Sequence, residues 1–182
     1  MTGYPAPYEQ HRLKRYLFRT CETGMIPKFS STGRPGGCNC GEIRYLVTRP
    51  FVTAYICHCH RCQKRTGSAF SMSVVIPAGG LQVIAGELHS TERRLENGAP
   101  NFSWLCPTCY TRTHTRREGS RTINLRAGTL DDTSDIRPMA QFWTESAQPW
   151  ALVTEDILSY PQQPTDFAPL LAAWRRHHPT ES

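Results

Sequence analysis

Seven of the eight cysteines of the chain fall into three tight groups, and their spacing is typical of metal ligands. Thiolates two or three residues apart can bind one tetrahedral Zn²⁺ through bonds of roughly 2.3 Å, whereas cysteines this close seldom suit the geometry of a disulfide. The groups are a C-x-C pair, a C-x-C-x-x-C triplet and a C-x-x-C pair, formed by Cys38 and Cys40, by Cys57, Cys59 and Cys62, and by Cys106 and Cys109. These residues therefore predict bound zinc.

The spacing allows more than one distribution of these ligands. If the two pairs join across the intervening chain, they form one closed four-cysteine site and leave the triplet with one coordination position that no sulfur fills. His58 or His60 could close the triplet as a structural site, or the triplet could be a group of free thiols. His58 is disfavoured because neighbouring side chains of an extended segment point to opposite faces. A closed site stabilises a fold, whereas an open one can bind a substrate.

Four blocks of sequence resemble one known family in their order and spacing. They are G-G-C-N-C-G-E-I-R-Y at 36–45, C-H-C-H-R-C-Q-K-R-T-G-S-A-F at 57–70, C-P-T-C at 106–109 and G-T-L-D-D at 128–132. The family is that of the glutathione-dependent formaldehyde-activating enzymes, which also includes centromere protein V. The resemblance extends from residue 36 to about residue 150, nearly two-thirds of the chain.

The resemblance implies a mainly β, Mss4-like β-tent fold with short helical turns, and two Zn²⁺ ions per chain. One zinc would be structural and bound by the two cysteine pairs, and the second would be open and catalytic, bound by the triplet. The implied activity is that of a carbon-sulfur lyase similar to S-(hydroxymethyl)glutathione synthase, which forms or cleaves S-hydroxymethyl adducts or a related thiol adduct. The implied substrates are a small thiol such as glutathione and a small aldehyde.

The residues that follow the triplet are candidates for binding the substrate. Lys64 and Arg65 could pair with the carboxylates of a glutathione-like thiol, since arginine offers two parallel N–H donors. Gly67 and Ser68 could donate backbone or hydroxyl hydrogen bonds to an anionic group. The two aspartates at 131–132 resemble an acid-base pair, but turn capping is the preferred interpretation because adjacent side chains diverge.

Two positions depart from the family pattern. Tyr110 stands after the second C-x-x-C cysteine, where the family usually has glycine in a left-handed conformation. A tyrosine that keeps this conformation would be strained by roughly 1 to 2 kcal/mol. Gln141 stands where histidine is frequent in the family. The resemblance therefore supports metal binding more firmly than the identity of the substrate.

Short β-type segments separated by glycine and proline predict the elements that position these residues. The predicted strands cover 42–48, 53–57, 69–76, 81–85, 102–106, 122–126 and 141–144. A helical turn is expected at 60–66. A helix at 166–176, capped by Thr165 or Asp166, would place Phe167, Leu170, Leu171 and Trp174 on one face as a peripheral brace. The predicted domains are a basic extension (1–35), a zinc-binding domain (36–150) and a C-terminal extension with a short helix (151–182).

The composition limits the setting in which the protein acts. No stretch approaches the roughly 20 apolar residues of a membrane helix, so we expect no membrane insertion. Cysteines in metal spacing favour a reducing compartment, and we expect the cytoplasm. The formal net charge is +6, of which the N-terminal extension with the first strand carries +4, from six basic and two acidic residues. Cys21 lies in this extension and has no partner in spacing.

The positive charge also supports an alternative function. A zinc-stabilised binding module could contact the phosphates of a nucleic acid, or a protein, through the N-terminal extension and through Arg112, Arg116, Arg117 and Arg121. No aromatic residue is interleaved with these four arginines to stack on bases. The enzyme interpretation is preferred, because a binding module has no need of an open metal site.

Overall fold

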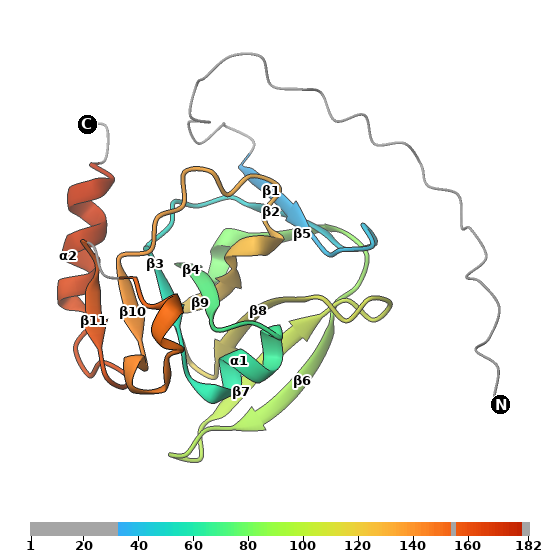
Figure 1. Ribbon diagram of the computed structural model, residues 1–182. Coiled ribbons are helices and arrows are strands. Elements are labelled where there is room, and N and C mark those ends of the chain that lie inside the picture. Colours follow the sequence, from blue (N-terminus) through green and yellow to red (C-terminus); the bar gives the residue numbers. More distant parts are fainter. Residues whose placement is uncertain (1–32, 154–155, 180–182) are drawn as a thin grey trace, which may run out of the picture.

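The computed structural model describes residues 33–153 and 156–179, in which two β-sheets and two α-helices form the fold (Figure 1). The smaller sheet has the order β1-β2-β5, with the bounds Arg34–Gly37, Arg44–Val47 and Leu81–Ala85. The larger sheet has the order β11-β10-β3-β4-β9-β8-β7-β6, with the bounds Leu158–Tyr160, Ala140–Phe142, Thr53–Cys57, Ser71–Pro77, Thr122–Arg126, Arg112–Arg117, Pro100–Leu105 and His89–Arg94. The helices are α1, His60–Thr66, and α2, Ala168–His177.

The prediction of a mainly β, Mss4-like fold is confirmed. The segments predicted at 53–57, 81–85 and 122–126 are strands with the predicted bounds, and the helical turn at 60–66 is α1. Four strands were not predicted, namely β1, β6, β8 and β11. The sequences of β6 and β8, HSTERR and RTHTRR, carry polar residues on both faces, so neither shows the apolar alternation by which a strand is recognised. The predicted basic extension and Cys21 lie almost entirely outside the described residues.

The larger sheet separates an apolar core from a polar face. Residues that pair across neighbouring antiparallel strands point to the same face of a sheet, and successive residues point to opposite faces. Ala54 pairs with Val74, and Val74 pairs with Leu125; all three are fully buried in the main core. The opposite face of the same strands carries polar residues and one cysteine of the triplet, namely Cys57, Ser71, Ser73, Asn124 and Arg126.

Helix α2 lies at the edge of the fold and packs one face against the main core (Figure 1). Leu170 and Trp174 are buried, and the ring of Trp174 lies 6.3 Å from that of Phe51. Phe167, which was expected on the buried face, is 42% exposed and is itself the N-cap residue. The predicted cap Asp166 lies one residue earlier, and its carboxylate accepts a hydrogen bond of 2.8 Å from the backbone N–H of Ala168.

The block at 128–132 joins the two sheets. The backbone N–H of Asp131 donates to the carbonyl of Pro35 at 3.1 Å, and its carboxylate forms an ion pair with Arg44. The Asp132 carboxylate accepts a hydrogen bond of 2.9 Å from the backbone of Ser134, which is a turn-capping contact. Both aspartates therefore have structural partners, in agreement with capping rather than acid-base chemistry.

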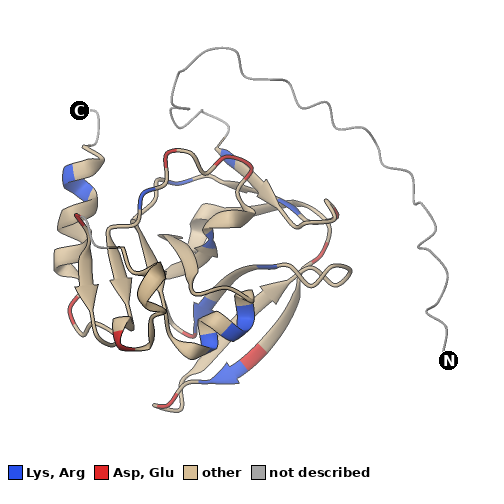
Figure 2. Cartoon of the chain, in the orientation of Figure 1, with Lys and Arg blue, Asp and Glu red and all other residues tan. Residues whose placement is uncertain are grey.

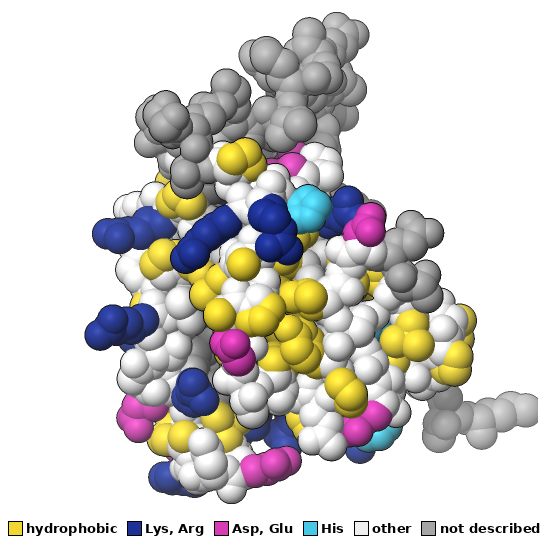
Figure 3. Space-filling model, turned by 90° about the vertical axis from the view of Figure 1, so that its left-hand side faces the viewer, with side chains coloured by type: hydrophobic (Ala, Val, Ile, Leu, Met, Phe, Trp, Pro, Cys, Tyr) yellow, Lys and Arg dark blue, Asp and Glu magenta, His cyan; other side chains and the backbone are white. Residues whose placement is uncertain are grey.

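Among the described residues, the face formed by the C-terminal elements has no group of metal-ligating side chains. Figure 3 views the molecule from this side and shows hydrophobic side chains at its centre with basic ones around them. A shallow groove of about 440 Å³ lies here between Tyr160 and Pro169 and is lined mainly by proline, glutamine and threonine. Within the described residues no helix is both long and apolar enough to cross a membrane.

Candidate metal centres

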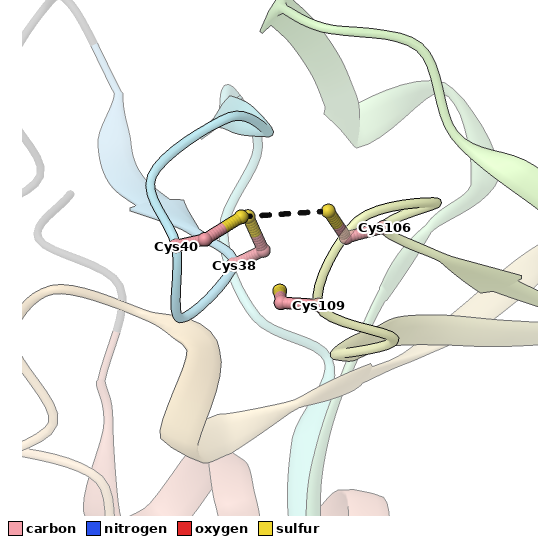
Figure 4. Close-up of side chains that lie close together, drawn as sticks. All are labelled: Cys38, Cys40, Cys106 and Cys109. Carbon is pink, nitrogen blue, oxygen red and sulfur yellow. Dashed lines mark hydrogen bonds between the residues drawn. The ribbon is translucent and has the colours of Figure 1, made fainter. Parts of the chain in front are cut away.

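The two cysteine pairs meet at the junction of the two sheets (Figure 4). Cys38 and Cys40 lie in the turn between β1 and β2, and Cys106 and Cys109 lie in the turn between β7 and β8. All four sulfurs lie within 4.8 Å of one another, with Cys38 and Cys40 3.4 Å apart and Cys40 and Cys106 3.7 Å apart. A tetrahedral zinc with bonds of roughly 2.3 Å requires sulfur separations of about 3.8 Å, whereas a disulfide requires about 2.05 Å. The four sulfurs therefore fit a metal ion.

The two turns share one backbone hydrogen bond. In each, the N–H of the first cysteine donates to the carbonyl five residues later, Cys38 to Ile43 and Cys106 to Thr111, both at 3.0 Å. Gly41 has a φ of 82° and Tyr110 a φ of 58°, so each turn has a left-handed residue after its second cysteine. This turn directs both sulfurs of a pair to one side. The strained conformation predicted for Tyr110 is present, and the tyrosine side chain is 75% exposed.

Replacing Tyr110 with glycine is expected to raise the free energy of unfolding by about 1 kcal/mol. Glycine removes the steric conflict of the left-handed conformation, and its greater freedom in the unfolded chain offsets part of the gain. Urea denaturation of the zinc-loaded protein measures the difference. The matched control is Tyr110→Ala, which keeps a Cβ at the same φ and should give no such gain. Equal stabilisation by both variants would show that the ring, rather than the backbone, is unfavourable.

The cysteine triplet forms a second group at the end of β3. Cys57 is the last residue of this strand, Cys59 is the N-cap residue of α1, and Cys62 lies in the first turn of the helix. The three sulfurs lie within 4.8 Å of one another, and those of Cys57 and Cys59 are 3.5 Å apart. These separations also fit a metal with thiolate ligands.

Among the described residues no histidine nitrogen joins the triplet. His58 is fully buried, and its Nε2 lies 3.2 Å from the amide oxygen of Gln141. The same amide accepts a hydrogen bond from the backbone of Val153, and its nitrogen donates to Ser159. Gln141 is therefore a buried residue that joins β10 to β11 and to His58. His60 is exposed at the start of α1.

The pKa values of Cys57 and Cys62 are shifted in opposite directions. Hydrogen bonds from Cys57 and Cys59, followed by one from Ser71 and the charge of Arg126, lower the pKa of Cys62. The pKa of Cys57 is raised, because its thiol donates to Cys59 and Cys62 and is buried. Negative charge is therefore favoured on Cys62 over Cys57. A thiolate is the form of cysteine that binds zinc.

The predicted substrate-binding residues differ in how closely they approach the triplet. The Arg65 guanidinium donates to the hydroxyl of Ser103 at 3.4 Å. Burial lowers the pKa of Arg65, and the thiols of Cys62 and Cys59 act in the opposite direction. Lys64 is exposed in the last turn of α1. Gly67 ends the helix with a φ of 63°, and the backbone of Ser68 donates to Thr66 at 3.3 Å. Of the four residues, Arg65 is the one with an electrostatic interaction with the triplet thiols.

Three further arginines near the triplet were not predicted as site residues. They are Arg93 on β6, Arg112 on β8 and Arg126 on β9. Each is half-buried, and each interacts electrostatically with the thiol of Cys62. Together with Arg65 they are called the arginine cluster here. Figure 2 shows basic residues on α1, on β6 and on strands behind the helix. Their positions in the sequence, 31 to 64 residues beyond Cys62, offered no signal of this proximity.

A β-bulge brings Arg112 to the polar face. Trp104 on β7 pairs with His114, but the next residue, Leu105, pairs with Arg112, so Thr113 is an extra residue in β8. In a regular strand without the bulge, Arg112, two residues before His114, would lie on the face of His114, whose ring stacks on Trp104 at 4.6 Å. The bulge instead places Arg112 on the same face as Arg126. Bulges are frequent next to active sites because they redirect a side chain.

The arginine cluster has no acidic partner within the described residues. None of its members takes part in the ion pairs of this part of the chain. The Nε atoms of Arg93, Arg112 and Arg126 are buried without a hydrogen-bond partner. Burial, followed by repulsion from Arg126 and Arg65, lowers the pKa of Arg112 to about 10. The positive charge of this face is therefore not compensated by acidic side chains.

The four arginines that were considered for contacts with nucleic acid have different surroundings. Arg112, one of the four arginines considered for phosphate contacts, belongs to the arginine cluster, and Arg116 donates to the carbonyl of Ser120 at 3.0 Å. Arg117 and Arg121 are exposed. Binding to nucleic acid stays a prediction that these contacts do not test.

Comparisons with known proteins identify one family. The family model described as "Glutathione-dependent formaldehyde-activating enzyme" matches residues 33–146, more than half of the chain. Among solved structures, the crystal structure of a Rhodobacter sphaeroides protein is similar at 19% sequence identity and a TM-score of 0.42, covering 69% of this chain and 98% of that one. A likeness at this level adds nothing to the assignment. Among curated proteins, none matches the chain.

Proposed function

The chain belongs to the glutathione-dependent formaldehyde-activating enzyme family, and on this premise we propose that it catalyses the reversible addition of a thiol to formaldehyde at the cysteine triplet. The observation that carries the proposal is the grouping of three sulfurs within 4.8 Å with no fourth protein ligand among the described residues. Three ligands and one open position are typical of catalytic zinc, whereas four protein ligands are typical of structural zinc.

The two groups of cysteines have different roles in this proposal. Cys38, Cys40, Cys106 and Cys109 would hold a structural zinc that joins the turns of two sheets. Cys57, Cys59 and Cys62 would hold a second zinc, which when bound supplies a Lewis acid that keeps a substrate thiol deprotonated and polarises a carbonyl oxygen. The chain would therefore bind two Zn²⁺ ions.

The protein residues contribute position and charge. Cys57 is fixed by β3 and Cys62 by α1, so their separation depends on the packing of the helix on the sheet. Ser71 and Arg126 stabilise negative charge on Cys62. In the reaction, the substrate sulfur forms a bond to the carbon of formaldehyde, the carbonyl π electrons move to the oxygen, and the proton of the thiol ends on that oxygen. No oxidant or reductant is needed.

The proposed substrate is glutathione or a related thiol. Arg65 is the best supported of the residues predicted to bind it, because it combines a cationic fork with proximity to Cys59 and Cys62. Lys64, Gly67 and Ser68 surround the end of α1 and are proposed as secondary contacts. We propose the cytoplasm as the site of action, because free cysteine ligands persist in a reducing compartment.

Exchange spectroscopy by NMR with ¹³C-formaldehyde and glutathione tests the activity. The zinc-loaded protein is expected to accelerate both formation and breakdown of S-hydroxymethylglutathione above the uncatalysed rate, without changing the equilibrium constant. Protein treated with a chelator is the control for metal dependence. Equal exchange rates with and without zinc-loaded protein would refute formaldehyde activation for this chain.

A further inference from the structure

We propose that the arginine cluster, Arg65, Arg93, Arg112 and Arg126, is an anion site next to the cysteine triplet, and that it restricts the substrate to thiols with two or more carboxylate or phosphate groups. The requirement for a thiol rests on the proposed function. The anion site does not, because it follows from the arrangement of the arginines alone.

The first step of the argument is the convergence of the four side chains. Arg126 lies on the polar face of the larger sheet, where it pairs with Ser73 and donates to the hydroxyl of Ser71 at 2.9 Å. Arg93 reaches the same face from β6, since it lies two residues from Thr91, which pairs with Ser103. Arg65 donates to that same Ser103 from α1. The cluster is therefore assembled from three strands and a helix.

The second step is the absence of compensating charge. All four arginines interact electrostatically with Cys62, but a zinc with three thiolates has a net charge of only −1. Within the described part of the chain, no aspartate or glutamate forms an ion pair with any of the four. Three of the four arginines, Arg93, Arg112 and Arg126, are half-buried, and such cations repel one another unless an anion binds between them. The cluster is thus suited to a ligand that brings negative charge.

The third step is the unused hydrogen-bonding capacity. Within the described residues, Arg93 and Arg112 donate no side-chain hydrogen bond to a protein acceptor, and the buried Nε atoms of Arg93, Arg112 and Arg126 have no partner. A guanidinium presents donors in a planar fork that matches carboxylate and phosphate oxygens. Several such forks next to a thiol site favour a thiol with several anionic groups over a neutral one.

Calorimetric titration of the full-length, zinc-loaded protein with matched probes tests this inference. The probes are glutathione, glutathione diethyl ester, S-methylglutathione and coenzyme A. The diester keeps the thiol but loses both carboxylates, and it is expected to bind about tenfold or more weakly than glutathione. S-methylglutathione keeps the carboxylates and should retain arginine-dependent binding. Coenzyme A distinguishes phosphate from carboxylate as the preferred anion.

The variants Arg112→Gln and Arg126→Gln are each expected to weaken glutathione binding about tenfold and to leave diester binding unchanged. Arg121→Gln, at an exposed arginine just before β9, is the matched control and should bind like the unmodified protein. Without ligand, Arg112→Gln should melt at the same or a higher temperature, because repulsion within the cluster is relieved. A purely structural arginine would instead lower the melting temperature.

The outcomes separate the two proposals. If the diester binds as tightly as glutathione, or if the arginine variants weaken both equally, the anion site is wrong even where formaldehyde activation is observed. If S-methylglutathione or coenzyme A binds in an arginine-dependent way while no thiol exchange is accelerated, the anion site stands and the proposed function fails. If none of the four probes binds, the anion site is refuted for this class of ligand.

Discussion

Replacing Cys106 with serine is expected to lower the melting temperature of the zinc-loaded protein by roughly 10 °C or more. Structural zinc can contribute on the order of 10 kcal/mol to the folding of small metal domains, and a chain with its own core depends on it for part of that amount. The Cys106 sulfur is fully buried beside Ile43 and Cys38 in a small cluster separate from the main core. Few other contacts can hold the two turns together once the metal is lost.

Differential scanning calorimetry and metal analysis together measure this effect. Cys106→Ser should lose one of two zinc ions and melt early, and a chelator should produce a comparable loss in the unmodified protein. The matched comparison is Cys59→Ser, which removes one sulfur from the other group. Equal decreases in melting temperature for the two variants would contradict the assignment of a structural role to the four-cysteine group.

Cys59→Ser is expected to reduce thiol-formaldehyde exchange by about a thousandfold or more while changing the melting temperature by only a few degrees. Cys59 is partly exposed, and its side chain makes no capping hydrogen bond to α1, so the helix does not depend on it. Its loss leaves two sulfurs, which is too few to hold a zinc as a catalytic site. The loss of turnover therefore follows from the loss of metal rather than from unfolding.

The exchange rate and the zinc content of the same preparation are measured together. A variant that retains two zinc ions and normal exchange would show that Cys59 is not a ligand. A variant that retains two zinc ions but loses exchange would assign Cys59 a role in the reaction without a role in metal binding. Only loss of both, with the fold preserved, agrees with the proposal.

The metal ligands could be predicted because their chemistry is local. Two sulfurs separated by one or two residues lie on one side of a strand or turn, so each pair was identifiable without knowledge of the fold. Helix α1 was predictable for the same reason, whereas the left-handed conformation of Tyr110 was expected only from the family pattern, which has glycine there. That the two pairs share one site could be inferred only by assuming a metal with four cysteine ligands. The structure places the four sulfurs within 4.8 Å of one another.

The arginine cluster was decided by tertiary structure. Arg93, Arg112 and Arg126 lie on three strands of one sheet, and β6 and β8 carry no alternation that would reveal them. The side of the sheet on which Arg112 lies depends on a single extra residue, Thr113, which periodicity cannot detect. The apolar positions of helix α2 were recognisable in the sequence, but only the tertiary structure shows that Leu170, Ala173 and Trp174 join the main core. Residue type and spacing determined which atoms could bind a metal, whereas strand pairing determined which charges surround it.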